Sequence, residues 1–450
     1  MKRIVLILVL LTSFQACKES LQFDLDKDQI DTEIALTSPE NLQALLNSCY
    51  DVFANVMDGD IQNLQELLGD NLAAPQNSAG SLYFTVFNRG TFSFRTADAV
   101  LLDLYRCIYR VNILQENLYR FPEELDQKTM TAEVKFLRAW CHWEVVKLWA
   151  QPYGFTADNS HAGISIRLES HYNVELRSSV AQVYAQILSD LKSAATDLPV
   201  DHGAYANQDA AKALMAKVYF TMNDFANAAA QATEVINSGR YQLSDTVERF
   251  TADQGNEVIF KTISTGPSDN RGGSFIGSYR SDKNDNPPLK PSKDFATMYD
   301  TADRRKGWIE VIEPSLPNEY NKCHKFDIDF FGVPLLHLAD MYLIRSESLL
   351  ESGGDKQAAA DDLNIIRERA FGSSNYNVTA ASIKISDVRL ERRKEMAFEG
   401  DRTTQLKRMG AKGEAIVIRG ADWNCPGSIL QFPASEKTQG FVFNEEGGCN

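Results

Sequence analysis

Three glutamates and three arginines share a short charged segment near the C-terminus, where carboxylates could do acid–base chemistry. Glu391, Glu395 and Glu399 are spaced four residues apart, which places them on one face of a helix. A glycosidase needs two carboxylates that face each other across a cleft, about 5 to 9 Å apart. Carboxylates stacked along one helix do not provide that arrangement, so we expect a structural ion-pair network. The arginines that can pair with these glutamates or with neighbouring helices are Arg392, Arg393 and Arg402.

The other residues with catalytic potential are expected to be core residues. His142 and Glu144 are two residues apart in an apolar helical stretch, so they lie on different faces and do not suit a metal site. There is no CxxC pair, and the six histidines are scattered. No nucleophile, phosphate-binding or dinucleotide motif occurs. We therefore expect no catalytic residue, no metal and no cofactor, and we do not expect an enzyme.

Aromatic residues outside the helical patterns are better candidates for ligand contact. Sugar rings have flat apolar faces that stack on aromatic rings, while Asn and Arg side chains hydrogen-bond their hydroxyl groups. We expect the ligand site in two regions, residues 76–95 and 241–332, with the indole of Trp308 as the best single platform. The alternative is that these rings only fix the loops in place. The candidate ligand residues are Trp308, Tyr83, Asn88, Arg89, Tyr279, Tyr299 and Tyr320.

The N-terminus has the pattern of an export sequence. Two basic residues precede the apolar run 4–11, and a small residue precedes Cys17. The apolar run is too short to cross a bilayer, which takes about 20 residues. The run 14–17 (Phe-Gln-Ala-Cys) resembles a bacterial lipobox, so we expect removal of residues 1–16 and lipid on Cys17. Two or more acyl chains hold a protein firmly on a membrane.

The charge of the chain limits its partners. Removing residues 1–16 takes away two positive charges, so the formal charge moves from −15 to −17. This acidity argues against nucleic acid as a partner and against adsorption to an anionic lipid surface. Residues 17–37 are polar and acidic, and we expect them to form a tether.

Six of the seven cysteines follow the lipobox. Cys425 and Cys449 lie in an irregular tail that faces an oxidising compartment, so they are candidates for a disulfide. Cys323 is an alternative partner for either of them. The cysteines within apolar helical patterns, which we expect to be buried free thiols, are Cys49, Cys107 and Cys141.

Apolar residues at helical spacing predict four helices before residue 200. The first begins with Ser38 as its cap and Pro39 in its first turn. The others cover about 97–119, 131–149 and 179–198. The third is apolar around most of its circumference, so we expect it to be central.

Two further helix pairs follow a faint internal repeat. The members of each pair are separated by a turn that ends in Asp224 or in Asp355. Aligning these two aspartates places Ala228 over Ala359, and small residues there let two antiparallel helices approach closely. This is the packing of tetratricopeptide repeats. An ordinary helical hairpin is the alternative for the first turn.

The predicted fold is mostly α, a tetratricopeptide-like scaffold of helical pairs with a long loop-rich insertion. Only Glu257 to Phe260 resembles a strand in that insertion. Long loops on a rigid scaffold are where binding sites tend to lie. The expected regions are a lipoprotein signal peptide at 1–16, the tether at 17–37, a helical region at 38–240, the ligand-binding insertion at 241–332, and a helical region with an irregular tail at 333–450.

Five segments carry a family resemblance in order along the chain. They are 132–139 (AEVKFLRA), 177–184 (RSSVAQVY), 342–347 (YLIRSE), 364–370 (NIIRERA) and 391–402 (ERRKEMAFEGDR). This ordered set, within about residues 36 to 410, resembles the SusD/RagB family. The chain departs from the family pattern at Gln405, where an acidic residue is usual, and in its C-terminal tail.

The resemblance implies a lipid-anchored protein on the outer membrane of a Gram-negative bacterium, facing the cell exterior. Its base would be four tetratricopeptide-like helix pairs. Members of that family cover a TonB-dependent outer-membrane transporter (SusC-like) and capture an oligosaccharide, or in some cases a peptide. We therefore expect a transporter and an oligosaccharide as partners. The alternatives are a peptide-binding member of the family, a tetratricopeptide scaffold for protein partners, and a surface glycan-degrading enzyme.

Overall fold

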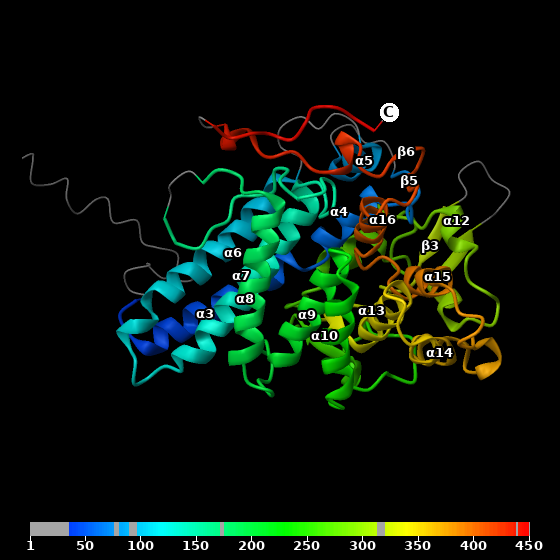
Figure 1. The fold of residues 1–450 in the computed structure, drawn as a ribbon, viewed down its shortest axis with the longest axis horizontal. Helices are drawn as coiled ribbons and strands as arrows, with labels where there is room; N and C mark the ends of the chain where they lie inside the picture. Colours follow the sequence, from blue (N-terminus) through cyan, green and yellow to red (C-terminus); the bar gives the residue numbers. More distant parts are fainter. Residues whose placement is uncertain are drawn as a thin grey trace, which may run out of the picture.

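The computed structural model describes residues 36–75, 81–89, 97–171, 175–312, 320–437 and 440–449, which are mostly α-helical (Figure 1). The helices are α3 (Pro39–Val56), α4 (Asp60–Leu68), α5 (Leu82–Asn88), α6 (Asp98–Asn117), α7 (Gln127–Trp149), α8 (Val180–Asp197), α9 (Gln208–Thr221), α10 (Phe225–Asn237), α11 (Gly273–Tyr279), α12 (Lys293–Ala296), α13 (Leu338–Glu351), α14 (Lys356–Phe371), α15 (Ile385–Glu395) and α16 (Arg402–Ala411). The antiparallel strand pairs are β1 (Val258–Lys261) with β4 (Pro334–His337), β2 (Ile309–Ile312) with β3 (Tyr320–Cys323), and β5 (Val417–Ile418) with β6 (Ala421–Asp422).

Local capping residues fix the starts of the first helices, as the sequence predicts. The Ser38 side chain accepts a hydrogen bond from the backbone of Asn41, and Pro39 occupies the first turn of α3. Ser179 and Gln182 form a capping box at the start of α8. Helix α7 packs between α6 and α8, and it is buried around most of its circumference. Its predicted central position is confirmed.

The two predicted helix pairs are present. Helix α9 packs against α10 and α13 against α14, and α10 also packs against α13. Asp224 caps α10 and Asp355 caps α14 through their side chains. Ala228 and Ala359 are fully buried where the helices of each pair approach. The small alanines therefore do let the paired helices lie close together.

The insertion at 241–332 has a packed interior and more strands than the sequence predicts. Phe250, Phe275, Phe326 and Phe331 form one cluster with ring centroids 4.8 to 6.2 Å apart. A Cβ atom on Gly272 would lie 2.4 Å from the Phe331 ring, so this glycine permits the packing. Strands β2 and β3 were not predicted, because four-residue strands that pair across a loop leave little local pattern.

The charged segment is not one continuous helix. Helix α15 ends at Glu395, and the chain turns through Phe398 (φ 63°) and Gly400 (φ 78°) before α16 begins. A Cβ atom on Gly400 would lie 2.8 Å from Cα of Gln62. The prediction that Glu399 shares a helix face with Glu395 is therefore wrong, because close packing against α4 requires the left-handed turn.

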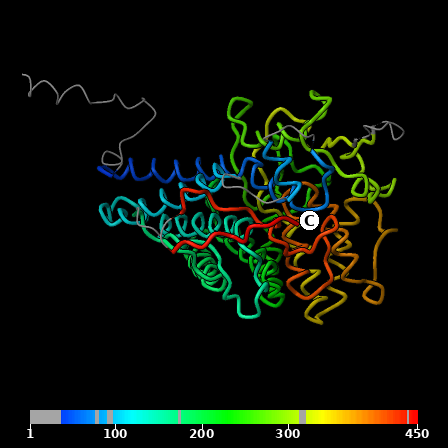
Figure 2. Tube along the Cα trace, turned by 90° about the horizontal axis from the view of Figure 1, so that it is seen from above, coloured from blue at the N-terminus to red at the C-terminus, as the bar shows by residue number. Residues whose placement is uncertain are grey.

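The elements are arranged so that two C-terminal segments lie beside α5 (Figure 1). The helical pairs from α6 to α14 stand side by side, and α5, the β5–β6 hairpin and the C-terminal tail lie together along one edge (Figure 1). Seen from above, the tail crosses the helices on this edge (Figure 2). We call this edge, made by α5, the β5–β6 hairpin and residues 425–449, the tail edge. Among the described residues, no helix has the length and apolarity needed to cross a membrane.

Candidate functional site

Three of the predicted ligand residues lie in the core, so that part of the prediction is wrong. Trp308 is 2% exposed, and its Nε1 donates a hydrogen bond to Glu248 at 3.0 Å. Tyr279 is fully buried, and Tyr299 is 5% exposed. These rings join the interior of the insertion to the helical scaffold. A sugar ring cannot reach them without unpacking that interior.

Three of the four remaining candidates lie on or next to α5. Asn88 is exposed, Tyr83 is half-buried, and Arg89 is 4% exposed. Tyr320 is the first residue of β3, but its side chain is not among the described parts of the chain. Cys17 and residues 76–80 and 90–96 also lie outside the described residues.

Helix α5 connects the two regions that the sequence singled out. The Tyr83 hydroxyl lies 2.9 Å from the hydroxyl of Ser278 on α11, within the insertion. Asn63 on α4 donates hydrogen bonds to both hydroxyl groups, at 3.3 Å to Tyr83 and 2.9 Å to Ser278. The structure therefore brings Tyr83 and the insertion together. These hydrogen bonds occupy the hydroxyl group of Tyr83, which is the only polar group of its side chain, so the contact is structural.

The β5–β6 hairpin places an arginine on α5 that the sequence analysis did not identify. The Arg419 guanidinium lies 3.8 Å from the centroid of the Phe87 ring, and its Nη2 donates to the Leu67 carbonyl at 2.8 Å. Arg89 donates to the carbonyl of the neighbouring Ile418 at 2.6 Å. A glycine after Arg419 indicates a turn, but no local pattern predicts that the turn lies on α5.

A surface groove of about 330 Å³ opens between α6, residues 165–171 and the C-terminal tail. We call it the tail groove. Its walls include the aromatic rings of Tyr105, Phe432 and Phe441, and Leu102 is 53% exposed beside them. The Tyr105 hydroxyl donates to the Ser165 carbonyl at 2.9 Å.

The polar rim of the tail groove complements its aromatic walls. The charged or titratable side chains on the rim are Arg106, Arg167, Glu169, His171 and Glu436. A groove with aromatic walls and a few polar groups is the usual form of a site for a small ligand. The sequence does not single out the aromatic residues of the groove, because Phe432 and Phe441 lie in an irregular tail and Tyr105 and Tyr109 in a regular helix.

A disulfide holds the tail in place. Cys425 and Cys449 are bonded to each other, with Cα atoms 5.2 Å apart, as expected from the sequence. The backbone N–H of Cys449 donates to the Arg89 carbonyl at 2.9 Å, which joins the end of the tail to α5. The free cysteines of the described residues are Cys49, Cys107, Cys141 and Cys323, all buried.

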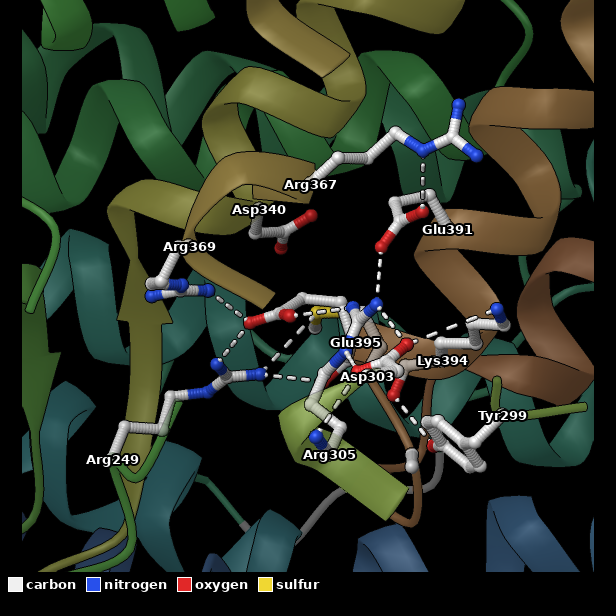
Figure 3. A network of polar contacts seen from close by, with 12 residues as sticks. Arg249, Tyr299, Asp303, Arg305, Asp340, Arg367, Arg369, Glu391, Lys394 and Glu395 are labelled. Carbon is white, nitrogen blue, oxygen red and sulfur yellow. Dashed lines mark hydrogen bonds and ion pairs between the residues drawn. The ribbon is translucent and has the colours of Figure 1, made fainter. Parts of the chain in front are cut away.

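An ion-pair network is present, as predicted, and it ties the insertion to the helical scaffold (Figure 3). The arginines of the charged segment do not pair with its glutamates, because Arg392 pairs with Asp340 and Asp401. Arg393 and Arg402 both pair with Asp70. Glu395 accepts hydrogen bonds from Arg249 at 2.7 Å, from Arg305 at 3.0 Å and from Arg369. Arg249 and Arg305 belong to the insertion, while Glu395 and Arg369 belong to α15 and α14. Arg305 also pairs with Asp303 at 2.8 Å.

The charges of this network stabilise each other. Burial on its own raises the pKa of Glu395, but the guanidinium groups of Arg369, Arg249 and Arg305 hold that pKa well below its usual range. Glu399 pairs with Lys325 at 2.6 Å and with Arg249. Each glutamate of the charged segment is thus occupied by basic partners, and the segment serves as a structural joint.

His142 and Glu144 are core residues, as predicted. They are 1% and 3% exposed, and His142 accepts a hydrogen bond from the backbone of Arg167 at 3.2 Å. Burial lowers the pKa of His142 to about 3, so the ring is neutral. In the part of the chain that the structure describes, no three His, Cys, Asp or Glu side chains are placed to hold a metal ion.

Two family models match the chain. The first, described as "Starch-binding associating with outer membrane", matches residues 23–220, and the second, the SusD family, matches residues 331–422. A SusD-like protein of Formosa agariphila is 29% identical over 148 residues, 31% of this chain. That match spans only 26% of the relative's own length.

Solved structures share the whole fold. A SusD superfamily protein of Bacteroides thetaiotaomicron superposes with a TM-score of 0.78 at 22% identity, covering 90% of this chain and 99% of its own. A putative sugar-binding protein of Bacteroides vulgatus gives a TM-score of 0.77 at 20% identity, covering 90% and 98%. Surface glycan-binding protein A of Bacteroides uniformis gives 0.73 at 18% identity, covering 90% and 99%.

The helical pairs, the ion-paired insertion and the groove beside the tail define a helical scaffold protein with a candidate binding surface on one edge. The chain belongs to the SusD/RagB family.

Proposed function

We propose that this protein is a glycan-binding lipoprotein of the outer membrane that captures an oligosaccharide at its tail edge. The observation that carries the proposal is the tail groove, whose aromatic walls and polar rim suit a sugar. The similarity to a glycan-binding and a putative sugar-binding protein supports it. The ion-paired glutamates favour binding over hydrolysis, because neither Glu391 nor Glu395 is free to act as a general acid.

Lipid on Cys17 would hold the protein on the outer surface of the membrane, and the bound sugar would pass to a TonB-dependent transporter. The family description "associating with outer membrane" supports this location. Transfer requires no covalent chemistry, only release of the sugar when the protein closes over the channel. Co-purification of the tagged protein with an outer-membrane barrel would support the partnership.

Affinity electrophoresis in gels that contain soluble polysaccharides tests the binding site. Tyr105→Ala removes one aromatic wall of the tail groove and should weaken binding by about 1 to 3 kcal/mol, the loss typical of a binding hot spot. Leu102→Glu introduces a charge at an exposed position of the same groove and should also weaken binding.

Tyr119→Ala is the matched control, because Tyr119 is 70% exposed and lies on the short 3₁₀ helix after α6, outside the groove. The control should bind as the unchanged protein does. Equal binding by Leu102→Glu, Tyr105→Ala and Tyr119→Ala, with all three folded, would contradict a site in the tail groove. A panel that includes peptides distinguishes the peptide-binding alternative.

A further inference from the structure

Three basic side chains, from the end of α5, from α16 and from the β5–β6 hairpin, have no acidic partner among the described residues. Arg89 is 4% exposed, and its Nη1 is buried without a hydrogen-bond partner. Arg419 is half-buried, and its Nε is also without a partner. Lys407 is 3% exposed, and its ammonium donates only to the Ser428 carbonyl, at 2.6 Å. We call these three residues the cation cluster.

Arg89 lies close enough to Lys407 and to Arg419 for its charge to act on both. Burial and the nearby charge of Arg89 lower the pKa of Lys407 to about 7 and that of Arg419 to about 9. Asp70, whose carboxylate acts on the charge of Arg419, is already occupied by Arg402 at 2.7 Å and by Arg393 at 3.1 Å. Buried charges in proteins are normally paired, so an unneutralised cluster in a chain of formal charge −15 calls for an anion.

The backbone holds both arginines in place despite a local cost. Arg89 and Arg419 each have φ of 46°, in the left-handed region that residues other than glycine rarely adopt. Two hydrogen bonds join α5, the hairpin and the disulfide-bonded tail at this point. The backbone N–H of Cys449 donates to the Arg89 carbonyl, and the Arg89 side chain donates to the Ile418 carbonyl. Such strain is retained where the surrounding structure fixes it, often at binding sites.

We propose that the cation cluster binds an oxyanion group of the ligand, a carboxylate or a sulfate ester, so that the captured oligosaccharide is acidic. Arg419 is the point of contact, because it is the only half-buried member of the cluster and its planar face is already stacked on Phe87. Guanidinium groups recognise such oxyanions through paired hydrogen bonds. The saccharide part of this inference rests on the proposed function, whereas the anion site itself does not.

Thermal unfolding of the full chain in sodium sulfate tests the anion site, with sodium chloride at equal ionic strength as the reference. An anion that binds only the folded protein raises the melting temperature along a saturating curve. We expect this curve for the unchanged protein and for Arg120→Gln, an exposed arginine away from the cluster. Arg419→Gln should shift half-saturation to a sulfate concentration at least about tenfold higher, as expected for the loss of one charge-assisted bond.

A second variant keeps the test decisive if Arg419→Gln does not fold. Lys407→Met removes a buried unpaired charge, so it should raise the melting temperature in chloride while weakening the response to sulfate. A sulfate response that does not saturate, or that is the same in all variants, is a general salt effect and overturns the inference.

Matched saccharides separate this inference from the proposed function. Oligogalacturonate is compared with its methyl ester, and a sulfated galactan with its desulfated form. We expect the acidic member to bind at least about tenfold more tightly, and Arg419→Gln to abolish the difference. Binding that ignores the acidic group would overturn the inference and leave the proposed function intact. A saturating sulfate response with no saccharide bound would support the anion site and contradict the proposed function.

Discussion

Glu395→Gln tests the role of the ion-paired joint between the insertion and the helical scaffold. Glu395 is fully buried, and its carboxylate accepts from three guanidinium groups (Figure 3). Glutamine keeps the shape of the side chain but removes its charge and turns one acceptor into a donor. That donor would face an arginine.

The expected cost follows from what remains of the network. Each arginine keeps at least one other carboxylate, namely Glu399 and Glu257 for Arg249, Asp303 and Glu391 for Arg305, and Glu257 for Arg369. The variant therefore leaves one buried charge uncompensated, which typically costs about 3 to 5 kcal/mol. An unfolding entropy of about 2.1 cal/mol/K per residue gives about 0.9 kcal/mol/K for a chain of this length, so the melting temperature should fall by about 3 to 6 °C.

The measurement is thermal unfolding by circular dichroism at neutral pH, with Glu124→Gln as the control at an exposed glutamate. Because folding lowers the pKa of Glu395, its ion pairs stabilise the protein at pH values above the pKa that this carboxyl group has in the unfolded chain. This stabilisation is lost as the pH falls towards the pKa of Glu395 in the folded protein. The difference between the variant and the unchanged protein should therefore narrow below about pH 4. If Glu395→Gln melts within a degree of the control, the joint does not stabilise the fold.

Cys17→Ala should abolish incorporation of an alkyne fatty acid, and equal labelling of the variant would refute lipidation at this residue. Serine at both Cys425 and Cys449 should cost about 3 kcal/mol on unfolding, because the disulfide closes a loop with a sequence separation of 24; unchanged stability would contradict this. Trp308→Ala should cost about 3 to 5 kcal/mol of stability and leave glycan affinity unchanged in the folded fraction, since the indole is buried. Burial raises the pKa of Glu133 to about 8, so its ionisation makes the unchanged protein less stable as the pH rises from about 4.5 to 8. Glu133→Gln should flatten this part of the plot of stability against pH. An unaltered plot would show that Glu133 does not cause the loss of stability.

The helical scaffold could be predicted because its determinants are local. Ser38 caps a helix where the sequence places it, the helix predicted from residue 179 begins there, and Asp224 and Asp355 begin the second helices of two pairs. In each case a polar cap residue directly precedes apolar residues at helical spacing, which is a short-range pattern. The disulfide was also predictable, since Cys425 and Cys449 were the two cysteines placed together in the irregular tail.

The positions of the loop residues could not be predicted, because they depend on partners far away in the sequence. Trp308 lies in a loop-rich segment, yet Glu248 and Lys325 enclose its indole. Arg419 meets Phe87 only because the hairpin folds onto α5. Glycine, proline and aromatic content indicated where the chain is irregular, but not which rings are covered.

Incubation of the purified full chain with a panel of soluble glycans distinguishes capture of a glycan from its hydrolysis, when bound glycan and new reducing ends are measured in the same sample. We expect saturable binding of at least one glycan, weakened by Tyr105→Ala and not by Tyr119→Ala, with no new reducing ends. Release of reducing ends by the unchanged protein, or the absence of binding to every glycan in the panel, would show that the protein is not a glycan-binding protein of the proposed kind.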